Sequence, residues 1–316
     1  MINYFYKYNY KNNDIELIEL LDDYIINDQI VIDNYDSKFN IFKNYIEKNG
    51  ITTGIEIERK YSDEVLEEAS FFTIRANKNI GYPVPENSYQ ELYFSNPNNH
   101  CDCKIEQVKP IHIKKDIKWK KRNFFTPFWL YDLLFISKIV KDMIKDSELK
   151  GVCIEKVYKG VKKPIFLDDV FQLKVSHKVN TNEEVNYSEY IHQITECNYC
   201  KARHIYTSLD AEVVCDKFEL RNKNVDLLYL GNTFGKRRII ISKTFRDMLI
   251  ESNLTNGVVL TPIFDKDHID VVNETPRINS RETFINSFLN YDTDTKWLIV
   301  NDKKEKIIVP DLSKLM

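Results

Sequence analysis

Glycine is scarce in this sequence, with only 8 glycines among 316 residues. Nucleotide-binding proteins cradle phosphates with glycine-rich loops, yet neither a P-loop nor a dinucleotide-binding glycine pattern occurs here. The nucleophile-elbow pattern G-x-S-x-G and the metalloprotease pattern H-E-x-x-H are also missing. The chain therefore shows none of the motifs that mark the common nucleotide-binding and hydrolytic enzymes, and we expect no catalytic activity.

Long hydrophobic runs and an excess of one charge are missing too. The longest apolar stretch, 124–136, is interrupted by Thr126, Pro127 and Asp132 and is too short to span a bilayer. Residues 1–14 contain no apolar core of signal-peptide length. Because 45 Lys and Arg residues face 48 Asp and Glu residues, the net charge is only -3, and no global field selects nucleic acid or an anionic membrane. These absences favour a soluble cytoplasmic protein with no membrane partner.

What the sequence does contain is one phrase that recurs three times, at 42–61, 140–159 and 245–264. Each copy has the spacing of an amphipathic helix, then a glycine, then an alternating β-branched strand. The glycines are Gly54, Gly151 and Gly257. A glycine just past a helix favours a positive φ, and Ser137 and Ser242 stand where helix N-caps are expected. The spacing between copies is far longer than the 20–50 residues of a solenoid repeat.

These signals predict an α+β fold in which repeated helix–Gly–strand modules surround mixed sheets. The length allows one large domain or two to three small ones. Turn-rich and polar breaks near 81–99 and 180–186 divide the chain into three predicted regions, each holding one copy of the phrase. The regions are 1–95, 96–190 and 191–316. Strands are also expected near 165–176, and at 296–300 and 306–309 as a hairpin.

Four of the six cysteines form two close pairs that are far apart in the sequence. These candidate metal ligands are Cys101, Cys103, Cys197 and Cys200. Two such pairs suit one tetrahedral structural zinc site, in which His100 or His204 is an alternative ligand. Unligated thiols and a redox role are the other interpretations, because disulfides are rare in the cytosol. The remaining Cys153 and Cys215 lie in apolar strand-like contexts, and we expect them to be buried.

The order of these parts resembles a bacterial family, the double-CXXCG motif immunity proteins, which are close to the immunity-protein family numbered eleven. The matching hydrophobic phrases are 135–157 and 239–264, and the resemblance covers about 95–265. Cys197 and Cys200 match the second cysteine knuckle, and Cys101 and Cys103 match the first, in which one spacer residue is missing. Lys104 and Lys201 stand where the family has glycine. The resemblance implies a cytoplasmic protein that neutralises a cognate protein toxin and has no activity of its own.

Such a protein would occlude the toxin with a large preorganised surface. We expect the acidic stretch 14–36 and a set of N-terminal aromatics to supply contacts. The aromatics are Tyr4, Phe5, Tyr6, Tyr8 and Tyr10. The alternative is a zinc-ribbon nucleic-acid-binding protein that uses the basic clusters 114–122, around Trp119, and 236–238. A third interpretation is an enzyme whose acidic and histidine residues converge in a pocket.

Overall fold

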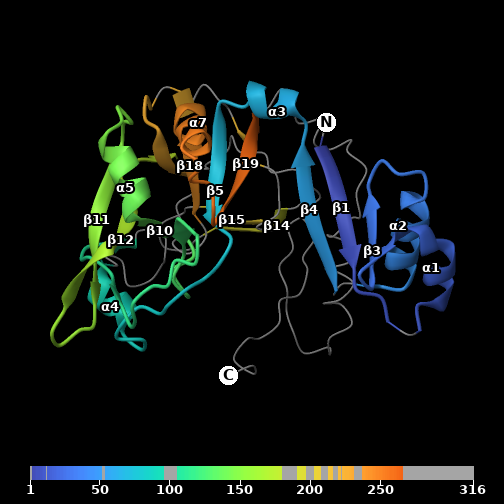
Figure 1. Ribbon diagram of the computed structural model, residues 1–316, viewed down its shortest axis with the longest axis horizontal. Coiled ribbons are helices and arrows are strands. Elements are labelled where there is room, and N and C mark those ends of the chain that lie inside the picture. The colour runs from blue at the N-terminus through green and yellow to red at the C-terminus, as the bar shows by residue number, and fades with distance from the viewer. Residues whose placement is uncertain are drawn as a thin grey trace.

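The structure is a computed structural model of the 316-residue chain. It describes residues 2–11, 13–51, 54–95, 105–179, 191–196, 203–207, 213–215, 220–221, 223–230 and 237–265. The described residues form an α+β fold with short helices packed against three larger sheets (Figure 1). This confirms the α+β class predicted from the sequence.

The first sheet is built from the N-terminal 61 residues and is antiparallel throughout. Its strand order is β2 (Ile25–Ile26), β3 (Gln29–Asp33), β1 (Ile2–Tyr8) and β4 (Ile55–Tyr61). Helices α1 (Ile15–Leu20) and α2 (Phe39–Lys48) lie beside it, with the 3₁₀ helix η1 (Asp22–Tyr24) between α1 and β2. Alternate residues of β1 face α2, and Tyr6 contacts the rings of Phe39 and Phe42 at centroid distances of 5.2 and 6.2 Å.

That alternation overturns one expectation about partner contacts. Tyr4, Tyr6 and Tyr8 are 2%, 1% and 2% exposed, so they are core residues rather than surface contacts. The reason is that β1 is a central strand with β3 and β4 on either side, and every second side chain must point into the helix-covered face. Phe5 and Tyr10 are half-buried.

The other two large sheets combine antiparallel and parallel pairs. The five-stranded sheet has the order β8 (His112–Ile113), β11 (Val152–Lys159), β12 (Ile165–Val175), β10 (Leu134–Ser137) and β9 (Phe124–Phe125). The six-stranded sheet has the order β13 (Lys178–Val179), β17 (Leu227–Leu230), β18 (Arg238–Ser242), β5 (Phe71–Ala76), β19 (Val258–Asp265) and β16 (Val213–Cys215). Parallel pairing occurs between β8 and β11, β13 and β17, and β16 and β19. The strand predicted near 165–176 is therefore confirmed as β12.

These two sheets share one hydrophobic core with helices α5 (Lys138–Lys145) and α7 (Lys243–Glu251). Each helix contributes two buried side chains, Val140 and Ile144 from α5 and Phe245 and Leu249 from α7. Burying side chains of this size contributes on the order of 2 kcal/mol each. The shared core therefore holds the two sheets together as one packed unit.

Each large sheet contains two strands that are joined in sequence by a helix. In the sheet these two strands lie on either side of a third strand, to which both are antiparallel. In the three sheets the element sets are β3, α2 and β4 around β1; β10, α5 and β11 around β12; and β18, α7 and β19 around β5. The second strand of each set follows a glycine with positive φ: Gly54 (82°), Gly151 (72°) or Gly257 (102°). The left-handed conformation expected at these glycines is thus confirmed.

The two predicted N-caps are confirmed as well. The Ser137 hydroxyl accepts a hydrogen bond from the backbone N–H of Val140 at 3.5 Å, at the start of α5. The Ser242 hydroxyl accepts one from the N–H of Phe245 at 3.1 Å, at the start of α7. Each serine satisfies one of the helix N–H groups that have no partner within the helix.

The remaining elements are short. They are α3 (Asp63–Glu68), α4 (Tyr89–Tyr93), and two antiparallel pairs, β6 (Phe94–Ser95) with β7 (Glu106–Gln107) and β14 (Ile191–Glu196) with β15 (Arg203–Thr207). The six-stranded sheet takes strands from all three predicted regions: β5 from 1–95, β13 from 96–190 and the rest from 191–316. The region boundaries themselves stay a prediction. The predicted strands 296–300 and 306–309 lie outside the described residues.

Candidate functional site

The predicted zinc ligands lie outside the described residues. Cys101 and Cys103 fall in 96–104, with the alternative ligand His100, and Cys197 and Cys200 fall in 197–202. His204 is described only by its backbone, as part of β15. Within the described ranges, no cluster of three or more His, Cys, Asp or Glu residues has the arrangement of a metal site.

The strands on either side of the cysteine pairs are described, and they follow the same plan. The first pair lies in the connection between β6 and β7, which are antiparallel partners through Phe94 and Gln107. The second pair lies in the connection between β14 and β15, which are antiparallel partners through Glu196 and Arg203. Both pairs therefore fall in the sequence between two antiparallel partner strands.

The prediction that Cys153 is buried was wrong. Cys153 is exposed, since β11 places its neighbours Val152 and Ile154 against the shared core and turns the cysteine to the opposite face. The side chain of Cys215 in β16 is outside the described side chains.

A pocket with several arginines opens on the six-stranded sheet, on the face opposite to α7. Phe72 and Ile74 of β5 point into the shared core, so the intervening Thr73 and the following Arg75 point the other way. Thr261 of β19 is the Cα partner of Thr73. This pocket, which we call the arginine pocket, is therefore built by long-range strand pairing.

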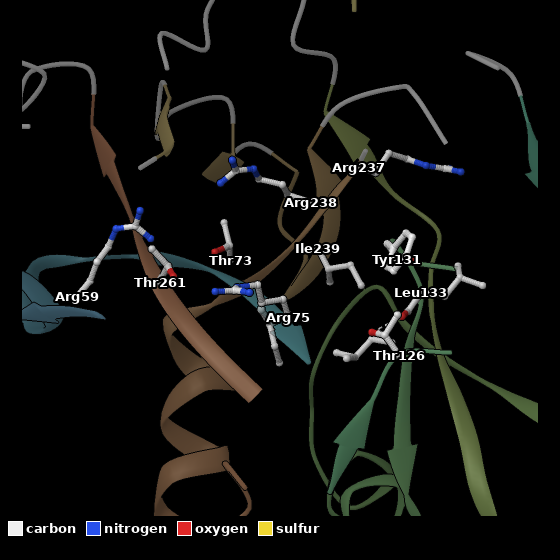
Figure 2. Close-up of a pocket in the computed structure, with 12 residues that line it drawn as sticks. Arg59, Thr73, Arg75, Thr126, Tyr131, Leu133, Arg237, Arg238, Ile239 and Thr261 are labelled. Carbon is white, nitrogen blue, oxygen red and sulfur yellow. Dashed lines mark hydrogen bonds between the residues drawn. The ribbon is translucent and has the colours of Figure 1, made fainter. Parts of the chain in front are cut away.

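Three guanidinium groups reach the arginine pocket from three strands. Arg238 precedes Ile239, whose Cα partner is Ile74, so the register places it beside Arg75. Arg59 comes from β4 of the first sheet, and its guanidinium also lies over the Tyr4 ring at 5.6 Å. Figure 2 shows these three groups gathered around the hydroxyls of the two threonines, Thr73 and Thr261.

A fourth arginine of the same pocket has a structural role. Arg237 is almost completely buried, and its Nε donates a hydrogen bond to Asp132 Oδ2 at 3.0 Å. The guanidinium lies over the ring of Tyr229 at 4.9 Å, and the Tyr229 hydroxyl donates to the backbone oxygen of Asp132 at 3.0 Å. Burial, together with the negative charge of Asp132, raises the pKa of Tyr229, so this tyrosine stays neutral.

This burial changes the interpretation of the basic cluster 236–238. Arg237 is committed to an internal ion pair and is not available to an external ligand. Arg238 is half-buried at the start of β18, and Lys236 is outside the described residues.

A cluster of stacked aromatic rings lies next to the pocket. The ring of Tyr82 stacks on Phe128 at 4.7 Å and 13° and contacts Trp129 at 5.0 Å. Trp129 in turn stacks on Tyr89 at 5.9 Å and 20°. We call these four residues the aromatic patch. Tyr82 is 37% and Trp129 39% exposed, so the patch presents ring surface to solvent.

Tyr131 joins the aromatic patch to the arginine pocket. It is 57% exposed, lines the pocket and follows Trp129 by two residues. The intervening Leu130 is fully buried, and this single anchor turns its two neighbours outward. From the sequence alone, 124–136 is only an interrupted apolar stretch. The exposure of Trp129 and Tyr131 was not predicted, because no sequence pattern separates them from core residues.

The segment that carries Trp129 is fixed by the backbone around it. The N–H of Phe128 donates to the Gly81 oxygen at 3.0 Å, and the N–H of Leu130 donates to the Pro127 oxygen at 3.2 Å. Trp129 itself has φ of 68°, a left-handed conformation that costs a non-glycine residue on the order of 1–2 kcal/mol. Strain of this kind persists where surrounding contacts enforce it, and it is concentrated at functional sites.

The basic segment 114–122 lies on the other side of the aromatic patch. The N–H of Lys114 donates to the Tyr82 oxygen at 3.1 Å, which places the segment next to that ring. Its lysines are exposed: Lys114, Lys115, Lys118, Lys120 and Lys121. Trp119, in contrast, packs edge-on against Phe125 at 5.4 Å and donates its Nε1–H to Asp169 at 3.2 Å. The exposed lysines therefore provide charge, and the tryptophan provides packing.

Within the acidic stretch 14–36, Asp14 differs from the other carboxylates, which are exposed or half-buried. Asp14 is 5% exposed and accepts hydrogen bonds from the Tyr8 hydroxyl at 2.8 Å and the Tyr45 hydroxyl at 2.9 Å. Burial opposes ionisation of Asp14, but these bonds and one from the backbone N–H of Lys11 outweigh it and lower its pKa. This carboxylate fastens α1 and α2 to β1.

Comparison with known proteins gives no relative from which function can be transferred, since no protein-family model and no curated protein matches the chain. Among the helices of the described ranges, each is too short or too polar to cross a membrane.

Proposed function

We propose that this protein binds and neutralises a cognate protein toxin by occlusion, in the manner of the immunity proteins that its sequence resembles. It acts in the cytoplasm and performs no chemistry of its own. The single observation that carries the proposal is the aromatic patch, held outward on a fixed segment by a strained Trp129. Trp, Tyr and Arg are the residue types that dominate the binding energy of protein interfaces.

The charges beside the patch indicate what kind of partner it fits. The exposed lysines of 114–122 lie on one side, and the arginine pocket lies on the other, beyond Tyr131. A partner with an acidic contact face would be attracted to this surface, and its rate of association would fall as salt rises. The expected contact between the acidic stretch 14–36 and a basic toxin stays a prediction, in which Asp14 takes no part because it is internal.

The scaffold proposed for this surface has two further parts. The three strand–helix–strand sets are copies of one module, supported by their shared topology and by the glycine that precedes each final strand. A structural zinc ion, held by Cys101, Cys103, Cys197 and Cys200, ties the β6–β7 and β14–β15 connections together. The donor set supports this, since thiolates are zinc's preferred structural ligands and both pairs lie in connections between antiparallel strands.

The alternative is a zinc-ribbon nucleic-acid-binding protein, and one observation favours it. Exposed lysines next to stacked aromatic rings are the combination that binds single-stranded nucleic acid. Affinity for an oligonucleotide would then decrease steeply with salt. A protein partner is preferred because the net charge of -3 gives the chain no overall attraction to phosphate backbones.

The experiment starts with a partner purified with the tagged protein from its native host and identified by mass spectrometry. The affinity of that purified partner is then measured for the wild type and for Trp129→Ala. Truncating a central aromatic residue costs about 2 kcal/mol, so we expect affinity to fall about 30-fold. Phe166→Ala is the matched control, because Phe166 is also 39% exposed but lies outside the patch.

The two variants separate the possible outcomes. A loss that is confined to Trp129→Ala supports the aromatic patch as the binding surface. Equal losses for both variants, or no effect of either, would contradict it. Recovery of nucleic acid instead of a protein, with salt-sensitive binding, would establish the alternative.

A further inference from the structure

The arginine pocket flanks the proposed toxin-binding surface, and it also has the chemistry of a small-anion site, which occlusion alone does not require. We propose that it binds the phosphate group of a small phosphate ester, with a nucleotide as the ligand that also uses its aromatic rim. The groups that would hold the phosphate are Arg59, Arg75 and Arg238, with the hydroxyls of Thr73 and Thr261 (Figure 2).

Charge is the first reason. Four arginines line the pocket, and no aspartate or glutamate is among the described residues that line it. Arg237 is paired with Asp132, and the guanidinium groups of the other three arginines line the same small volume. These three arginines make interactions of their own as well. A guanidinium has five N–H donors, so one arginine can serve a protein partner and an anion at the same time.

The number of donors and their directions distinguish phosphate from carboxylate. A carboxylate has one negative charge and two oxygens, and a single arginine matches it in a bidentate pair. A phosphate monoester carries close to two negative charges and three free oxygens. Guanidinium groups that arrive from three separate strands, with two hydroxyls between them, match the larger charge and the greater number of oxygens.

Size and the rim agree with this choice. The pocket encloses about 60 Å³, whereas one water molecule needs on the order of 15 Å³ by the same kind of measure. A compact group of about four or five heavy atoms fits, which is the size of phosphate. Tyr131 also lines the pocket, with 57% of its surface exposed, so its ring is available to stack on a base attached to the phosphate.

The test is calorimetric titration of the purified protein with inorganic phosphate, a sugar phosphate and adenosine monophosphate. Arg75→Gln is the main variant, because Arg75 is exposed and its loss leaves the core intact. Removing one charge-assisted contact should weaken binding of all three ligands by about 10- to 100-fold. Arg246→Gln is the control: it removes the same charge from α7, where the guanidinium lies over Phe72 on the opposite face of the sheet.

The source of the phosphate is decided by Tyr131→Ala. If the wild type prefers adenosine monophosphate and Tyr131→Ala loses that preference, the ligand is a nucleotide. If the wild type binds inorganic phosphate, the sugar phosphate and adenosine monophosphate equally, the pocket is a general phosphate site. No binding by the wild type up to about 10 mM ligand would overturn the proposal. Equal binding by wild type and Arg75→Gln would also overturn it. Trp129→Ala should bind phosphate normally, so failure here and failure of toxin binding are distinguishable.

Discussion

Replacing Gly257 by alanine tests how closely the residue before β19, in the third strand–helix–strand set, packs against the backbone of β9. Gly257 has φ of 102°, and an added Cβ would lie 2.8 Å from the Phe124 backbone oxygen. It would also lie 3.2 Å from Arg122 Cβ and 3.3 Å from the Phe124 nitrogen. Contacts below 3.0 Å with backbone atoms cannot be relieved by a side-chain rotation, so β9 or the start of β19 must move.

Gly54 is the internal control, because it occupies the same place in the first set without the crowding. Its φ is 82°, and an added Cβ would meet nothing closer than 3.8 Å. The left-handed conformation costs alanine about 1–2 kcal/mol at either position. Alanine offsets about 0.4–1 kcal/mol of this by restricting the unfolded chain. We therefore expect Gly54→Ala to cost about 1 kcal/mol.

Gly257→Ala carries the steric penalty in addition. Overpacking in a close-packed interior costs about 1–3 kcal/mol, so the total loss for Gly257→Ala is about 2–4 kcal/mol. Urea unfolding of the wild type and both variants, followed by circular dichroism, measures the free energies of unfolding. Equal losses for the two variants would refute the reasoning, since the conformational penalty is shared and only the contact with Phe124 differs.

Three further outcomes are expected. Asp132→Asn leaves a buried guanidinium without its counter-charge and should lower the free energy of unfolding by about 3–5 kcal/mol. Asp142→Asn, at a solvent-screened surface ion pair, should leave the free energy of unfolding nearly unchanged in the same urea assay. The folded-state pKa of Asp14 is lowered, so this carboxylate stabilises the fold at pH values above its ordinary pKa near 4, and the stabilisation disappears as the pH falls below that value. Asp14→Asn should therefore flatten the acid limb of a plot of the free energy of unfolding against pH. Wild-type protein should contain about one zinc per chain by elemental analysis. Cys197→Ser should lose both metal and stability, whereas the control Cys153→Ser, at an exposed free thiol, should keep both.

Local features of the fold could be predicted from the sequence because they depend on neighbouring residues. Ser137 and Ser242 cap helices, and Gly151 and Gly257 take positive φ, since capping and turn chemistry act within a few residues. The strand 165–175 follows in the same way from β-branched and aromatic residues.

The order of strands could not be predicted, because it depends on contacts far apart in the chain. Strand β5 inserts between β18 and β19, more than 160 residues away in sequence. Only that pairing brings Arg75 beside Arg238 and Thr261, so the arginine pocket has no signature in any single segment. Tyrosines of β1 were misjudged for a related reason, since their burial depends on neighbours on both sides of the strand.

The central claim is that the aromatic patch neutralises a toxic partner, and a protection assay tests it most directly. Host cells would express the identified partner alone, with the wild type, with Trp129→Ala and with Phe166→Ala. We predict that the partner alone stops growth, that the wild type and Phe166→Ala restore it, and that Trp129→Ala does not, with all three proteins present at equal levels. A harmless partner, or full protection by Trp129→Ala, would contradict the claim.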